Sequence, residues 1–103
     1  MHEVDGAVAL DERIRYGDAW LAKGIAHQML GELDAAVAAL EKFVAINGSS
    51  IEGHVRLSRL YGEQQKKDAA QRAKQEASST WAALPAFQKK RQRGWWLRLI
   101  TGL

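Results

Sequence analysis

The hydrophobic and polar positions of this chain do not alternate in the manner of half-buried β-strands. Alanine, leucine, glutamate, lysine and glutamine are abundant instead, and Pro85 is the only proline. These residue types favour helices, whereas a proline in a helix interior would interrupt one. The pattern therefore predicts an all-α protein.

Four helices are predicted before Pro85. The first begins at about Asp18, a suitable N-cap, and ends at Gly31, which can adopt a left-handed conformation there. The second ends at the turn-forming sequence NGSS, and the fourth carries little more than a stripe of alanines. The predicted helices cover residues of about 18–30, 33–46, 51–64 and 67–82. Because their connections are short, consecutive helices should be antiparallel neighbours.

A further helix is predicted after Pro85, which suits the first turn of a helix. At 100° per residue, five apolar side chains of this segment fall on one arc of the helix. They are Trp95, Trp96, Leu99, Ile100 and Leu103. Arg98 and Thr101 face the other way. The segment therefore reads as an amphipathic helix in which tryptophans adjoin a basic cluster.

A shift of 34 residues along the chain aligns its DAA sequence at 34–36 with a second one at 68–70. This is the period of a tetratricopeptide repeat, and the stretch AWLAKGIAHQMLGELDAAVAALEKFVAIN resembles one copy of that repeat. The matching positions are Trp20, Gly24, His27, Gly31, Ala36 and Leu40 in this copy, and Leu57, Tyr61, Ala70 and Ala77 in the next. Four positions depart from the pattern: Lys23 replaces a leucine, Gln65 the second glycine, Gly48 the closing proline, and Phe43 a small residue.

The resemblance implies a short solenoid of antiparallel helix hairpins, with a generic four-helix bundle as the alternative. Residues 1–84 would form the repeat-like domain, with copies at about 17–50 and 51–84, and residues 85–103 a C-terminal basic helix. The stretch GAVALDERIRYGD resembles the end of a preceding half-repeat, followed by a linker into Asp18. Such arrays usually need about three units to bury a continuous core, so something should cover the exposed ends of this one.

The charge is unevenly distributed along the chain. Its net value is +3, yet from Ala77 onward there are five basic residues and no acidic one, which leaves 10 basic and 12 acidic residues upstream. A mildly acidic body with a basic tail indicates contact with acidic surfaces or phosphate groups.

Catalytic and metal chemistry find little support in the sequence. There are no cysteines, the three histidines lack the spacing of metal ligands, and no phosphate-binding loop or nucleophile motif is present. We therefore expect a non-enzymatic protein without a metal or cofactor. No segment approaches the roughly 20 apolar residues that span a bilayer, and the first residues lack the positive charge of a secretory signal. The expected location is the cytoplasm or the cytoplasmic face of a membrane.

The resemblance implies a protein–protein interaction module, in which the first helix of each repeat lines a groove. Carried over by position, the groove residues would be Leu21, Ile25, Gln28, Met29, Val55, Arg59 and Glu63. Leu21, Ile25 and Met29 recur at i, i+4 and i+8, which fits an ordinary helix–helix core equally well. The partner would be another protein, a larger complex or a second copy of the chain.

The tail leaves several contacts open. It can dock on its own domain or on a partner, as in an adaptor or accessory subunit, or it can lie on an anionic membrane as part of a peripheral structural factor. Nucleic acid is the weakest of the alternatives, because the acidic body offers no broad basic surface. The residues expected to make the tail contact are Lys89, Lys90, Arg91, Arg93, Trp95, Trp96, Leu99 and Ile100.

Overall fold

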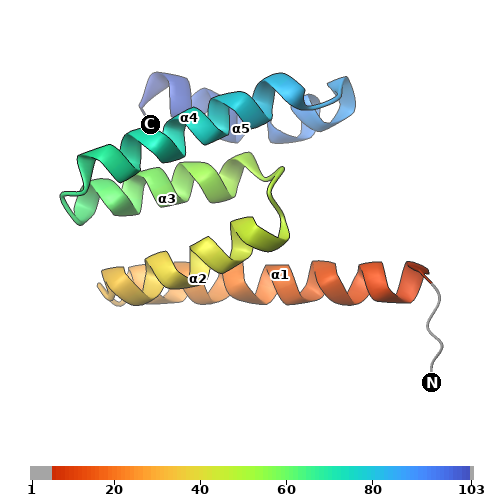
Figure 1. Cartoon of the computed structure of the whole chain (residues 1–103), viewed down its shortest axis with the longest axis horizontal. Coiled ribbons are helices and arrows are strands. Elements are labelled where there is room, and N and C mark those ends of the chain that lie inside the picture. Colours follow the sequence, from red (N-terminus) through yellow and green to blue (C-terminus); the bar gives the residue numbers. More distant parts are fainter. Residues whose placement is uncertain (1–5, 103) are drawn as a thin grey trace.

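The computed structural model describes residues 6–102 of the chain, and the side chains of residues 17–102. All regular structure in this part of the chain is helical, which confirms the predicted all-α class (Figure 1). The helices are α1 (Gly6–Met29), α2 (Leu33–Ile46), α3 (Ile51–Glu63), α4 (Lys67–Ala83) and α5 (Ala86–Thr101). Helices α2, α3 and α4 begin and end within one residue of the predicted bounds.

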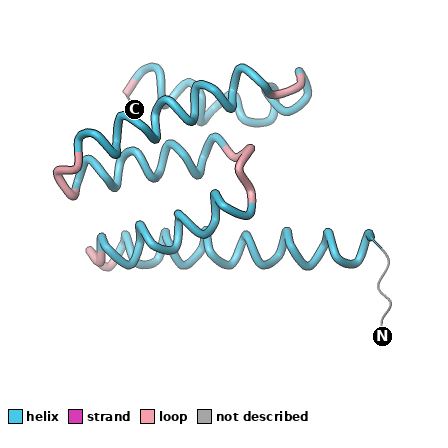
Figure 2. The backbone as a smooth tube through the Cα atoms, in the orientation of Figure 1, coloured by secondary structure: helices cyan, strands magenta, loops and turns pink. Residues whose placement is uncertain are grey.

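The helices form two antiparallel hairpins, α1 with α2 and α3 with α4, joined by short loops (Figure 2). The hairpins pack on each other through α2 and α3, and α5 packs chiefly on α3 and less on α4. Each hairpin therefore has one helix in the contact between the hairpins, and α5 covers the far side of the second hairpin.

The start of the first helix differs from the prediction. Helix α1 begins at Gly6 and passes through Asp18 without interruption, so Asp18 is not an N-cap and the predicted linker before it is wrong. Gly17 lies buried inside this helix, where an added Cβ would be only 3.3 Å from Cγ2 of Ile46. A glycine costs a helix about 1 kcal/mol, which this close approach to the end of α2 can offset. The first turns of α1 extend beyond the end of α2 (Figure 1).

The first core cluster fills the space between the hairpins. Its buried members are Ala36, Val37, Leu40, Phe43, Leu57, Leu60 and Ala73, and Trp20, Leu21, Leu33, Val44 and Tyr61 pack against them. Gly24 lets α1 approach α2 here, because a Cβ on it would lie 2.7 Å from Cγ of Leu40. Ser58, which stands 34 residues later, is also small and buried, and its hydroxyl donates to the carbonyl of Val55 at 2.7 Å. Gly24 and Ser58 are thus small residues at equivalent positions of the 34-residue period, one in each hairpin.

Polar contacts fix the hairpins to each other. At the α2–α3 turn, Ser50 caps α3 by accepting the N–H of Gly53, and the buried His54 donates through Nε2 to the carbonyl of Gly48 at 3.0 Å. Farther along, the Tyr61 hydroxyl of α3 donates to the Glu41 carboxylate of α2. Burial and this acceptor raise the pKa of Tyr61 to about 12.

Candidate interaction surface

The inner face of α5 forms a second core cluster with the second hairpin. Ile51, Val55 and Leu84 are its buried members, and Trp81, Trp95, Trp96 and Leu99 pack against them. The rings of Trp81 and Trp96 are stacked, with centroids 4.8 Å apart and planes 2° from parallel. The tail helix therefore docks on its own α3 and α4, and it shares a core with the residues assigned above to the repeat-like domain.

A side chain that sequence reasoning missed joins α5 to the start of α3. The Oε1 atom of Gln92 accepts the N–H of Ile51 at 2.6 Å, and its Nε2 donates to the carbonyl of Ser49 at 3.0 Å. Gln92 thus provides an acceptor for an N–H of the first turn of α3, which has no partner within the helix. Its position one turn before Trp96 and two before Leu99 places it on the inward arc, a signal that the sequence did contain.

Trp95 lies among the arginines of α3 and α5. The guanidinium carbons of Arg98, Arg56 and Arg59 are 4.4, 4.8 and 6.0 Å from the centroid of its ring system. Arg56 also donates through Nε to the Glu52 carboxylate at 2.9 Å. We call Trp95, Arg56, Arg59 and Arg98 the arginine–tryptophan site.

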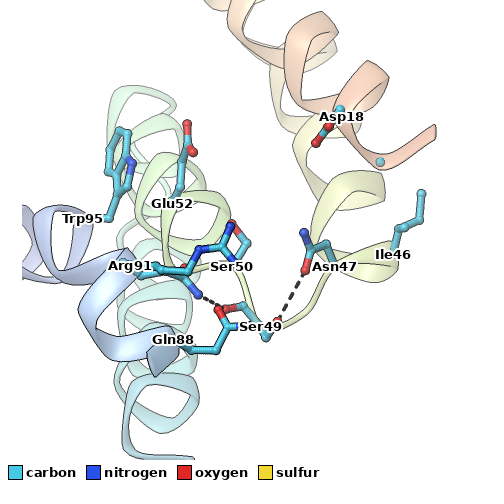
Figure 3. Close-up of a pocket in the computed structure, with 11 residues that line it drawn as sticks. Asp18, Ile46, Asn47, Ser49, Ser50, Glu52, Gln88, Arg91 and Trp95 are labelled. Carbon is cyan, nitrogen blue, oxygen red and sulfur yellow. Dashed lines mark hydrogen bonds between the residues drawn. The ribbon is translucent and has the colours of Figure 1, made fainter. Parts of the chain in front are cut away.

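A cleft of about 690 Å³ opens beside this site, where α1, the α2–α3 turn, α3 and α5 converge (Figure 3). The residues that line the cleft include Asp18, Asn47, Ser49, Glu52, Arg91 and Trp95. The lining is mostly polar and carries both signs of charge, so it suits a polypeptide segment better than an apolar small molecule.

The groove residues expected from the resemblance lie in different environments. Leu21 packs against the first core cluster, Ile25 and Gln28 are half-buried, and Met29 is 82% exposed. Val55 is only 1% exposed and lies beneath α5, so it has to be removed from the set of contact residues. Arg59 is half-buried in the arginine–tryptophan site, and Glu63 is exposed at the end of α3.

The tail residues divide between the two sides of α5. Trp95, Trp96 and Leu99 point into the domain, and Lys89 lies with its Nζ 5.8 Å from the centroid of Trp81. The exposed members are Lys90, Arg91, Arg93 and Ile100, together with Phe87 and Leu97, which the sequence reasoning did not select. The apolar side chains that α5 offers to solvent are thus different from the predicted tryptophans.

Protein-family models, curated proteins and solved structures were compared with the chain, and none of them matches it. Within residues 6–102, no helix combines the length and the apolar character needed to cross a membrane.

Proposed function

We propose that the protein is a non-enzymatic protein–protein interaction module, built like a short tetratricopeptide array and acting as an adaptor or accessory subunit of a larger assembly. The matched small residues of the two hairpins, Gly24 and Ser58, support the repeat-like construction. Helix α5 would then close the array on the side of the second hairpin.

The cleft is the observation that carries this proposal. Two hairpins and α5 converge on it, and side chains such as Asn47 and Gln88 can hydrogen-bond the main chain of a bound segment. The opposite charges of Asp18 and Arg91 at its edge give a partner an orientation.

Affinity capture with a cleft variant tests the proposal. The double variant Asp18→Lys/Arg91→Glu keeps the net charge but reverses both charges of the cleft. The control, Glu76→Lys/Lys74→Glu, makes the equivalent pair of charge reversals at exposed positions of α4. We expect the full chain and the control to retain the same proteins from a lysate, as identified by mass spectrometry, and the cleft variant to lose them. Equal capture by all three would refute binding through the cleft.

Peripheral membrane association is a second candidate, favoured by the outward face of α5. Phe87 (63%), Leu97 (46%) and Ile100 (58%) are exposed there among Lys90 and Arg93. Such a face can enter the headgroup region, and each basic residue adds about 1 kcal/mol near anionic lipid.

Vesicle co-sedimentation tests the second candidate. Binding to phosphatidylserine vesicles should weaken steeply as salt shortens the Debye length to about 8–10 Å, and Phe87→Ser/Leu97→Ser should abolish it. If this variant binds as wild type does, the outward face of α5 has no role at a membrane.

A further inference from the structure

Arginines of two helices face one another across the arginine–tryptophan site. On α3, Arg56 and Arg59 are one turn apart. On α5, Arg98 was expected to face away from the apolar arc, but it lies beside Trp95 at the edge of that arc, because residues three apart are neighbours on a helix. The indole holds the guanidinium groups near its ring system through cation–π contacts at 4.4 to 6.0 Å from its centroid. The three cations are therefore kept close together although they repel one another.

Their charge is only partly compensated within the described residues. Glu52 bonds to Arg56, whereas no carboxylate of residues 17–102 forms an ion pair with Arg59 or Arg98. One nitrogen of Arg59, Nη2, is buried and has no hydrogen-bond partner in this part of the chain. A buried N–H without an acceptor is unfavourable, and a guanidinium offers a fork that fits a carboxylate. The site thus lacks an anionic acceptor.

We propose that the arginine–tryptophan site binds carboxylate side chains of an acidic segment of the partner protein. This inference rests on the proposed function and specifies the chemistry of the partner. The carboxylates would accept hydrogen bonds from the exposed Arg98 and, once its guanidinium turns to bring the buried Nη2 outward, from Arg59, while the adjoining cleft holds the neighbouring main chain. Because the guanidinium groups already lie against the indole, little side-chain entropy is lost when the segment binds.

The surroundings favour an acidic polypeptide over a polymer of phosphates. Asp18 and Glu52 line the cleft next to the site, and they would repel a backbone that carries a negative charge at every unit. A polypeptide can place its carboxylates at the arginines and neutral residues beside Asp18 and Glu52. The exposed Phe87 and Leu97, which a membrane would contact, lie on the outward face of α5.

Fluorescence anisotropy with a defined probe tests the inference. The probe is a fluorescein-labelled dodecapeptide of alternating glutamate and serine, and its control has glutamine in place of glutamate. We expect the full chain to bind the acidic probe at low ionic strength, and Arg59→Gln or Arg98→Gln to weaken binding about tenfold. The matched control is Arg93→Gln, which removes the same charge from an exposed position of α5 outside the site and should change affinity less than about twofold.

Any of the following results would overturn the inference: no binding of the acidic probe, an equal loss of binding with Arg93→Gln, or equal binding of the glutamine probe. The inference would also be overturned if a thymidine dodecanucleotide or phosphatidylserine vesicles bound more tightly than the acidic probe and this binding depended on Arg59 and Arg98. The site would then recognise phosphate. Circular dichroism confirms that each variant is folded. If capture from the lysate depends on the cleft but the acidic probe does not bind, the proposed function stands and only the acidic chemistry of the partner is refuted.

Discussion

At the scale of single residues, the two hairpin turns differ in chemistry but share a backbone conformation. Gly31 has a φ of 78° after α1, and Gln65 has a φ of 66° after α3, where the repeat pattern has its second glycine. A side chain in the left-handed region costs roughly 1–2 kcal/mol, because its Cβ approaches the following carbonyl. The departure at Gln65, visible in the sequence, therefore becomes a point of backbone strain.

Gln65→Gly should stabilise the protein by about 0.5–1 kcal/mol, since relief of the strain exceeds the added entropy of the unfolded chain. Urea unfolding measures the change. Gln75→Gly, in the exposed middle of α4, should have the opposite sign and cost about 1 kcal/mol. A loss of stability with Gln65→Gly would show that its side chain makes a contact that outweighs the strain.

Tyr61 should make stability fall at alkaline pH. The ordinary pKa of tyrosine is about 10, and in the fold it is about 12. Between these values the folded state binds more protons than the unfolded state, so the free energy of unfolding decreases as pH rises. Urea midpoints from about pH 9 to 11 should show a shallower decline in Tyr61→Phe than in wild type. A Tyr16→Phe variant leaves Tyr61 as the only tyrosine, and its tyrosinate absorbance should titrate with a pKa near 12. Titration with a pKa near 10 would contradict the raised pKa of Tyr61.

At the scale of helices, close approach depends on glycines at particular contacts. Gly24→Ala should destabilise the protein by about 1–3 kcal/mol, because the new Cβ would lie 2.7 Å from Cγ of Leu40. Gly62→Ala is the matched control: it lies in α3, nothing surrounds its Cβ position within 4 Å, and the change should stabilise by up to about 1 kcal/mol. Thermal melting of both variants gives the comparison. Equal melting temperatures of the two variants would show that the α1–α2 contact does not require a glycine at position 24.

Helix bounds were predictable where local signals agreed. The NGSS turn predicted the start of α3, where the structure shows Ser50 as the cap, and Gly31 predicted the end of α1. The start of α1 was missed because an aspartate such as Asp18 can stand either at an N-cap or inside a helix. The helix continues through Gly17, whose close approach to Ile46 is a tertiary contact that the local sequence does not reveal. Likewise, the arc of Trp95 and Trp96 was evident, but not what covers it. The hydrogen bonds of Gln92 join residues more than 40 positions apart, and no local pattern encodes such a pairing.

At the scale of the whole molecule, α5 is held by a few contacts that are distant in sequence. Gln92→Ala should cost about 1–3 kcal/mol, because it leaves the N–H of Ile51 without its acceptor. Gln88→Ala, one turn earlier on the same helix, should change stability by less than about 0.5 kcal/mol. Near-ultraviolet circular dichroism, which reports the Trp81–Trp96 stack, should weaken at lower urea in the Gln92 variant than in the Gln88 variant. Coincident transitions would mean that Gln92 does not hold α5 in place.

Because α5 is made last among the helices, its docking on α3 follows the synthesis of α3 with a delay. The two hairpins leave the ribosome before the helix that covers Ile51 and Val55. At roughly 5–20 residues per second, the 16 residues of α5 take about 1–3 s to make, so the synthesis of α3 is complete at least that long before α5 can cover it. Until α5 docks, a newly made chain therefore exposes an apolar surface that the folded protein hides, and a surface of this kind favours contact with chaperones or with a neighbouring chain.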